Sequence, residues 1–186
     1  MSAKEGKVAW GVTGSGDKIA EVFNIMKAVR NQYDDLDIRV YLSKAGEQVV
    51  KMYNLFHILE ENFERISIER NPNSPFLAGE LQLGRYDFLL IAPTTSNTAA
   101  KISLSLADSL LSNAAIMALK AFVPVYILPS DFTEGTIITN LPDGKDLKLR
   151  IRKEDVEHVR NLEEMDGVFI LKSPDEIQNV FRENYT

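Results

Sequence analysis

The chain has 186 residues, of which 45% are hydrophobic and 26% are charged, and its formal net charge at pH 7 is −6. This composition is typical of a globular protein, and we expect residues 1–186 to form a single domain that is long enough to bury a sizeable core. The acidic balance argues against nucleic acid as a partner, because phosphate contacts need a basic surface. The absence of cysteine excludes disulfides, a thiolate nucleophile and cysteine-ligated metal centres.

Metal sites and membrane segments are not expected either. His57 and His158 are the only histidines and lie far apart in the sequence, so we predict no metal site. No apolar run approaches the roughly 20 residues of a membrane-spanning helix, and the N-terminal stretch MSAKEGKVAW contains no apolar signal core. We therefore expect a cytoplasmic protein without a membrane segment.

The first half of the chain alternates between short apolar runs and segments with helical spacing. Lys7–Val12 is predicted to be a buried strand, and the helix after it has Asp17 as its expected N-cap. Ile38–Ser43 is predicted to be a second strand, and a helix is expected to begin in Lys44–Phe56. The apolar positions of the first helix are Ile19, Val22, Phe23, Met26 and Val29.

The middle of the chain carries the longest predicted elements. Asp87–Pro93 is a continuous apolar run, as expected for a strand that is covered on both faces. A long helix is predicted from about Thr98 to Ala121, and Val123–Pro129 is predicted to be the next strand. This helix is rich in Ala, Ser and Leu, which predicts that it is buried and takes part in a homo-oligomer.

The last third repeats the alternation. Lys148–Arg152 is predicted to be a strand, Lys153–Met165 a helix and Gly167–Ser173 a strand, and a final helix begins at Ser173 with Glu176 completing a capping box. Strands alternating with helices predict an α/β fold, a three-layer parallel sheet with helices on both faces. Ligands bind such sheets at the carboxyl ends of the strands, so the loops that follow the strands are the candidate sites.

Three of these loops are rich in small polar residues. After the first strand come Thr13, Gly14, Ser15 and Gly16, where two glycines would let a ligand approach the backbone closely. A tight turn would explain the same residues, since they match neither the dinucleotide fingerprint nor a P-loop. Ser43 follows the second strand, where it is either a ligand contact or only an N-cap.

The third loop is the most informative, because it has more hydrogen-bonding side chains than a helix cap needs. Such crowding favours a flat polar heterocycle or a phosphate as the ligand. The loop consists of Pro93, Thr94, Thr95, Ser96, Asn97 and Thr98.

At these three loops the chain resembles the Rossmann-like (flavodoxin-like) flavoproteins that include the homo-oligomeric flavin-containing cysteine decarboxylases. The similarity covers about residues 7–130 and continues into the next helix, including Asp108. The resemblance implies that the cofactor is FMN and that the first and third loops bind its phosphate, ribityl chain and ring edge. It also implies that Ser43 and Asp108 belong to the cofactor site and that the protein is a homo-oligomer.

Two departures from the decarboxylases indicate a different activity. Gly79 stands near the position of their catalytic histidine, and LPSDFTEG replaces their Pro-x-Met-Asn-x-x-Met-Trp motif. We therefore expect no cysteine decarboxylase activity. The chain is more similar to the archaeoflavoproteins, which implies an FMN-dependent oxidoreductase or electron carrier that accepts electrons from ferredoxin and passes them to another redox protein.

Other interpretations remain open. A flavin-dependent lyase or prenyltransferase would need an acid–base residue, for which Glu80 and Asp131 are candidates, and a non-catalytic flavin-binding module is also possible. No residue is assigned as catalytic. Trp10 is expected in the core rather than beside a flavin. A local basic run is either the solvent face of an edge strand or a docking patch for an acidic donor. Its residues are Lys148, Arg150, Arg152 and Lys153.

Overall fold

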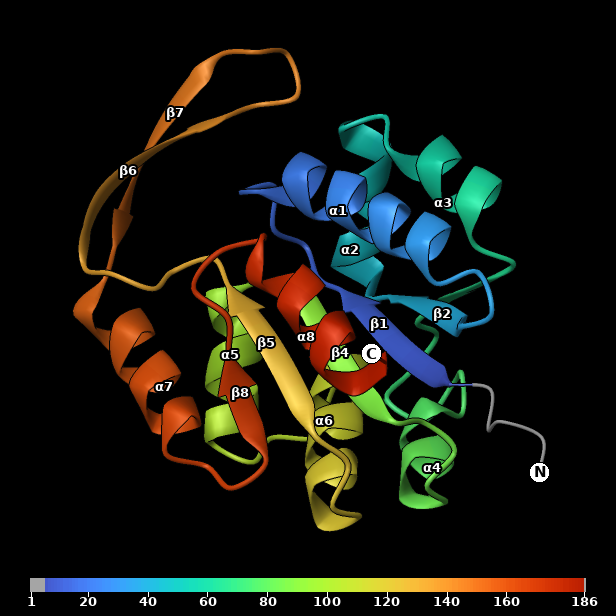
Figure 1. Cartoon of the computed structure of the whole chain (residues 1–186). Coiled ribbons are helices and arrows are strands. Elements are labelled where there is room, and N and C mark those ends of the chain that lie inside the picture. Colours follow the sequence, from blue (N-terminus) through green and yellow to red (C-terminus); the bar gives the residue numbers. More distant parts are fainter. Residues whose placement is uncertain (1–5, 186) are drawn as a thin grey trace.

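The computed structural model describes residues 6–185, in which a six-stranded parallel sheet lies between two layers of helices (Figure 1). Residues 1–5 of the N-terminal stretch in which no signal core was expected lie outside the described residues. The strand order is β3-β2-β1-β4-β5-β8. The strands are β1 (Lys7–Val12), β2 (Asp37–Leu42), β3 (Arg65–Ile68), β4 (Phe88–Thr94), β5 (Val125–Pro129) and β8 (Val168–Ile170).

Each face of the sheet carries its own hydrophobic core, because successive side chains of a strand point to opposite faces. Val8, Trp10 and Val12 of β1 pack with one helix layer, whereas Ala9 packs with the other. The first layer contains α1 (Ile19–Gln32), α2 (Lys44–Met52), α3 (Phe56–Asn62) and α8 (Glu176–Tyr185). The second contains α4 (Leu77–Gln82), α5 (Ser96–Ser103), α6 (Leu110–Lys120) and α7 (Lys153–Glu163). Within residues 6–185, no helix has the length and apolar character needed to cross a membrane.

The strand order creates a switch point between β1 and β4. From β1 the chain adds β2 and β3 toward one edge, and from β4 it adds β5 and β8 toward the other, while β1 and β4 pair directly. Loops that leave these two strands therefore diverge to opposite faces of the sheet and leave space between them. The predicted three-layer α/β fold is confirmed, and its first and third polar loops meet at this switch point.

Trp10 belongs to the core, as predicted. Its ring is fully buried against Phe23 and Phe63, and its indole Nε1 donates a 2.8 Å hydrogen bond to the carbonyl oxygen of Ala92. The indole N–H is thus satisfied inside the sheet layer, which allows a large aromatic side chain to be buried next to β4.

The long helix predicted from Thr98 to Ala121 is wrong, because the segment forms two helices, α5 and α6. After Leu104 the chain turns at Ser105, whose φ of 58° is incompatible with a continuing right-handed helix. Ser109 then opens α6 in a capping box with Ser112. Most of α6 is covered within the same chain by its neighbours α4 and α5, so its apolar composition does not by itself require another subunit.

Two predicted helix starts are also wrong. Lys18, with φ of 57°, is the N-cap of α1 in place of Asp17. The carboxylate of Glu176 accepts a hydrogen bond from the Lys172 backbone N–H (3.0 Å) instead of closing a capping box on Ser173. Both errors shift a boundary by one to three residues, the usual scatter of helix ends.

A hairpin outside the main sheet is the main feature that the sequence pattern missed. Strand β6 (Gly135–Asn140) pairs antiparallel with β7 (Asp146–Ile151) in a separate two-stranded sheet, and Figure 1 shows it projecting away from the main body. In its register Ile137 lies opposite Leu149. Opposed residues share one face, so apolar side chains line one face of the hairpin while Lys148 and Arg150 lie on the other.

Candidate functional site

Thr13 joins the first and third loops at the switch point. Its buried hydroxyl donates to the carbonyl oxygen of Pro93 (2.8 Å) and accepts from the backbone N–H of Thr95 (2.8 Å). The Thr13 N–H also donates to the Pro93 carbonyl oxygen (3.2 Å). One threonine thus fixes the spacing of two loops that are about 80 residues apart in sequence, so a ligand would meet a pre-formed surface.

Several of the predicted site hydroxyls have structural partners. The Thr94 hydroxyl donates to the Ile91 carbonyl oxygen (2.7 Å), and the Ser43 hydroxyl accepts from the Gly46 N–H (2.9 Å) as the N-cap of α2. Thr95 caps α5 by accepting from the Thr98 N–H (3.2 Å). These residues shape the site through the backbone, and Ser43 has the N-cap role that was its alternative interpretation.

Other groups of the same loops remain available to a ligand. Asn97 is exposed, and the hydrogen bonds between described residues leave its side-chain amide without a partner. The same bonds use none of the backbone N–H groups of Gly14, Ser15 and Gly16. Because these bonds also use neither the Ser96 nor the Asn97 N–H group at the start of α5, the switch point presents a concentration of donors suited to an anion.

The glycines of the first loop are needed for contacts within the protein. A Cβ added at Gly14 would lie 2.6 Å from the Cβ of Ala45 in α2, and one at Gly16 would overlap the hydroxyl of Tyr53. Helix α2 and Tyr53 therefore make the close approach to these glycines that the sequence analysis assigned to a ligand.

On one side of the first loop lies the hollow that we call the helix-start hollow, with a volume of about 310 Å³. Its cationic residues are Lys44 and Lys101. Its one carboxylate, Glu69, accepts from the N–H of Lys44 (3.1 Å) and from that of Leu110 (2.8 Å), at the starts of α2 and α6. The lining residues are Thr13, Gly14, Ser43, Lys44, Ala45, Glu69, Thr95, Asn97, Thr98, Lys101, Ser109 and Leu111.

On the other side lies a second hollow, the hairpin cavity, with a volume of about 250 Å³. Its floor contains two acidic residues, Asp17 and Asp131, and its outer wall is the apolar face of the hairpin. No lysine or arginine is among the described residues that line it. The lining residues are Gly14, Ser15, Gly16, Asp17, Tyr53, Thr95, Ser96, Ser130, Asp131, Ile137, Thr139, Leu141, Leu147 and Leu149.

The floor of the hairpin cavity is a hydrogen-bonded set of small side chains. The hydroxyls of Ser15 and Ser130 are 2.5 Å apart, and the Ser96 hydroxyl donates to the carboxylate of Asp131. Burial, with a further contribution from the charge of Asp131, raises the pKa of the Asp17 carboxyl above its ordinary value. The sequence had indicated Asp17 only as a helix cap. The small-residue turn before it and the apolar alternation of β7 were the signals that could have located this cavity.

Asp108 lies outside both hollows. Its largely exposed carboxylate forms an ion pair with Lys101 (Nζ to Oδ1, 2.9 Å), and Lys101 lines the helix-start hollow. Asp108 could thus act on a ligand only through Lys101. The structure brings the predicted residues of the first loop, Ser43 and residues 95–98 of the third loop around the two hollows. Pro93, Thr94 and Asp108 line neither hollow.

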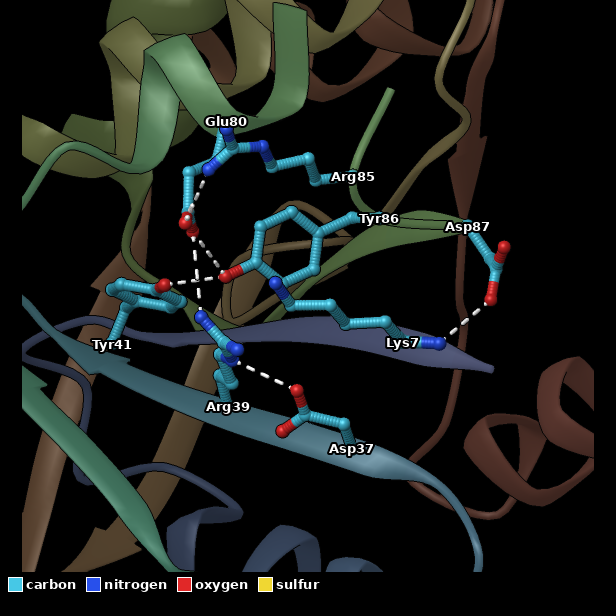
Figure 2. A network of polar contacts seen from close by, with 8 residues as sticks. All are labelled: Lys7, Asp37, Arg39, Tyr41, Glu80, Arg85, Tyr86 and Asp87. Atoms are coloured by element: carbon cyan, nitrogen blue, oxygen red, sulfur yellow. Dashed lines mark hydrogen bonds and ion pairs between the residues drawn. The ribbon is translucent and has the colours of Figure 1, made fainter. Parts of the chain in front are cut away.

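Glu80 belongs to a separate polar network, shown in Figure 2. The Tyr86 hydroxyl donates to its carboxylate (2.8 Å), and the guanidinium of Arg39 lies 3.7 Å away. Burial raises the pKa of Glu80, but the hydrogen bond from Tyr86 and the charges of Lys7, Arg39 and Arg85 outweigh burial and hold the pKa below its ordinary value of 4.5. Glu80 is therefore an ionised structural group rather than a proton donor at the switch point.

A second tyrosine extends this network into the core. The hydroxyls of Tyr41 and Tyr86 are 2.6 Å apart, and burial together with this contact raises the pKa of Tyr86. The neighbouring Gly79 is buried on α4, where an added Cβ would overlap the ring of Phe76.

The comparison with protein families identifies the class of this fold. The family model described as Flavoprotein matches residues 1–178. The chain belongs to the Flavoprotein family. An uncharacterized protein of Methanocaldococcus jannaschii is 49% identical to this flavoprotein over 174 residues, covering 94% of this chain and 93% of the relative. A dihydromethanopterin reductase (acceptor) of the same organism is 33% identical, covering 94% of this chain and 95% of the relative.

Solved structures agree with this membership. DmrB of Burkholderia xenovorans, described in complex with FMN as a cubic protein cage for redox transfer, superimposes with a TM-score of 0.81 at 27% identity, covering 97% of this chain and 95% of that chain. AnUbiX (PadA1), in complex with FMN and dimethylallyl pyrophosphate, has a TM-score of 0.63 at 17% identity and shares the fold alone. The predicted family and the predicted Rossmann-like fold are thus confirmed for this flavoprotein.

Proposed function

We propose that this flavoprotein binds FMN at the switch point and works as an oxidoreductase or electron carrier. The observation that carries the proposal is the concentration of unpaired N–H donors where the first and third loops meet at the end of the sheet. It is supported by the relatives named as dihydromethanopterin reductases and by DmrB, which is described with FMN. When bound, FMN would supply reversible electron uptake.

The helix-start hollow suits the phosphate end of FMN better than the hairpin cavity does. Lys44 and Lys101 offer positive charge, and the Ser96 and Asn97 N–H groups at the start of α5 are available to an anion. Asn97 would contact the flavin with its free amide, and Thr13 would keep the two loops in place. Asp108 would orient Lys101 through their ion pair.

Reconstitution tests the cofactor assignment. Purified protein incubated with FMN and dialysed is expected to retain flavin absorption, because the bound ring is shielded from water. Asn97→Leu is expected to weaken FMN binding by roughly 10-fold, since a polar edge of the flavin loses its partner. Asn161→Leu, a change of an exposed asparagine on α7, is the matched control. A colourless product after reconstitution would end the proposal.

The proposed redox partner is ferredoxin or another acidic protein, which would dock on the outer face of the hairpin. Lys148 and Arg150 are exposed on that face. Arg152, one of the four residues of the predicted basic run, is engaged within the chain. Its guanidinium pairs with both carboxylate oxygens of Asp155 (2.8 and 2.6 Å) as α7 begins. Opposite charge would accelerate encounter with an acidic donor.

Charge reversal tests this partner. The double variant Lys148→Glu and Arg150→Glu is expected to slow reduction by ferredoxin about 10-fold and to flatten its salt dependence, with FMN content unchanged. Lys27→Glu, on the outer surface of α1, is the control. Stopped-flow reduction that is equally fast in both variants would exclude the patch, and rapid reduction by NADH alone would exclude the ferredoxin assignment.

We also propose that residues 1–186 act as one flavoprotein domain in a cytoplasmic homo-oligomer. Exposed apolar side chains support the assembly, in particular Leu104 and Leu106 between α5 and α6 and Phe76 and Leu83 around α4. Light scattering of the FMN-loaded protein at micromolar concentration is expected to give a mass above the monomer, and a monomeric mass would contradict the assembly.

A further inference from the structure

Glu69 supplies the carboxylate of the helix-start hollow, and the sheet fixes its position. Its backbone N–H donates to the carbonyl oxygen of Leu42 (2.9 Å), which continues the parallel pairing of β3 with β2 by one residue. Glu69 therefore stands at the carboxyl end of β3, beside the start of α2, at the edge of the sheet where such folds bind ligands. The sequence analysis did not single out this residue, because its place depends on that pairing.

Both oxygens of the Glu69 carboxylate are engaged with helix starts. Oε2 accepts from the N–H of Lys44, the first residue of α2 (3.1 Å), and Oε1 accepts from the N–H of Leu110, the first residue of α6 (2.8 Å). The loop that follows Glu69 is also tied to α6, because the side-chain amide of Asn113 donates to the carbonyl oxygen of Pro72 (2.9 Å). The carboxylate therefore cannot turn out of the hollow without giving up two hydrogen bonds.

The positions that the hollow offers to an anion are therefore unequal. At the start of α5, the hydrogen bonds between described residues leave the N–H of Asn97 unused, and Lys101 lines the hollow nearby. At the starts of α2 and α6, the Glu69 carboxylate already supplies the negative charge that a helix N-terminus attracts. A second anion there would lie beside a like charge in a partly desolvated space, where repulsion is stronger than in water. The charge pattern of the hollow thus suits one phosphate.

We propose that Glu69 is a specificity-determining residue, which restricts the helix-start hollow to a ligand with a single phosphate. A flavin mononucleotide meets this condition. A flavin dinucleotide brings a second phosphate next to the first, and the fixed carboxylate of Glu69 repels it. This inference rests on the proposed function for the identity of the flavin. The restriction to one phosphate depends only on the charges of this chain, so it holds for inorganic anions as well.

Two substitutions that separate the charge of Glu69 from its reach test the proposal. Glu69→Gln keeps the length of the side chain and removes the charge, whereas Glu69→Asp keeps the charge on a shorter side chain. Fluorescence titrations of flavin-free protein are expected to show that wild type and Glu69→Asp prefer FMN to FAD by at least roughly 100-fold, and that Glu69→Gln lowers this ratio about 10-fold. Glu60→Gln, which removes an exposed carboxylate of α3, is the matched control and keeps the wild-type ratio.

The ratio of the two affinities isolates specificity, because a general loss of stability weakens both ligands alike. An unchanged ratio in Glu69→Gln would overturn the proposal. An equal loss of preference in Glu69→Asp would overturn it too, because the effect would then belong to the hydrogen bonds of Glu69 and not to its charge.

Inorganic anions separate this inference from the proposed function. Phosphorus NMR titrations compare inorganic phosphate with pyrophosphate on the flavin-free protein. Wild type is expected to bind pyrophosphate no more tightly than phosphate, and Glu69→Gln is expected to bind pyrophosphate about 10-fold more tightly than wild type does. Tighter binding of pyrophosphate than of phosphate by wild type, or no gain in Glu69→Gln, would overturn the inference even if FMN binds. The expected anion preferences in a protein that does not bind FMN would contradict the proposed function alone.

Discussion

The helix-start hollow and the hairpin cavity share the first loop but are built in different ways. The helix-start hollow is enclosed by the ends of strands and the starts of three helices, which are anchored by Thr13, Ser43 and Glu69. The hairpin cavity has one wall outside the main sheet, held by Tyr53. One glycine-rich loop therefore borders two different hollows. One is rigid and rich in N–H donors, and the other is acidic and more easily deformed.

The largest effect is expected from Gly46→Ala, which disturbs the packing of the rigid helix-start hollow. A Cβ at this position would overlap the carbonyl oxygen of Val12 at the end of β1, so α2 must move and lose its Ser43 cap. We expect the free energy of unfolding to fall by about 3 kcal/mol and FMN affinity by roughly 100-fold. Thermal unfolding and flavin titration measure both.

Gln48→Gly is the matched control for that variant, because it changes an exposed residue of α2 outside the lining of the hollow and adds no atom. It is expected to cost about 1 kcal/mol through helix propensity and to leave flavin affinity nearly intact. Equal losses in the two variants would show that α2 is sensitive to any substitution, and the rigid packing at Gly46 would no longer explain the hollow.

An intermediate effect is expected from Tyr86→Phe, which lies outside both hollows. The variant removes the hydrogen bond to Glu80 and the contact with Tyr41 in a buried place, so the free energy of unfolding is expected to fall by about 2 kcal/mol. Binding of FMN is expected to stay unchanged. A change in its affinity would mean that the network in Figure 2 is coupled to the switch point.

The same network makes a prediction about acid. Because the pKa of Glu80 in the folded protein lies below its ordinary value of 4.5, its ionised form stabilises the fold above that pH. This contribution is lost as the pH falls through the lowered folded value. Glu80→Gln is therefore expected to flatten the acid limb of the stability curve below about pH 4.5. Denaturant titrations from pH 3 to 7 measure it, and an unchanged acid limb would contradict the prediction.

The smallest effect is expected from Tyr53→Phe, which tests how the hairpin is held over the hairpin cavity. Loss of the hydrogen bond to Asn140 in an exposed position is expected to cost about 0.5 kcal/mol in stability. Amides of the hairpin are expected to exchange hydrogen about two to five times faster, whereas amides of α2 and α5 keep their rates. Uniformly faster exchange would show that the hairpin and the rigid side open together.

The sequence predicted the main sheet better than the break between α5 and α6 or the β6–β7 hairpin, for physical reasons. Buried parallel strands such as β4 are unbroken apolar runs, and polar loops that follow them must gather at one edge of the sheet. The break between α5 and α6 was missed because Ser105, a residue without glycine's freedom, adopts the left-handed conformation there. The hairpin was missed as a separate unit because β6 alternates weakly and pairs only with β7 among the described strands.

The candidate site was predicted as a set of residues but not as an arrangement. Thr13 and Asn97 stand out by type and place in the sequence. Whether a hydroxyl faces a ligand or caps a helix depends on the path of the backbone, and for Ser43 the N-cap geometry was decided by Gly46 three residues later. The place of Asp17 in the floor of the hairpin cavity depends on β6 and β7, which are more than a hundred residues away in the chain.

The carboxylate of Glu69 links the starts of α2 and α6, which belong to different helix layers. It places a negative charge where two helices would otherwise present uncompensated N–H groups. The chain thus contains its own counter-charge at the place proposed for a phosphate, so we expect the two helix layers to reach their native spacing before any cofactor arrives. Cofactor insertion would then be a late step in biogenesis rather than the event that organises the fold.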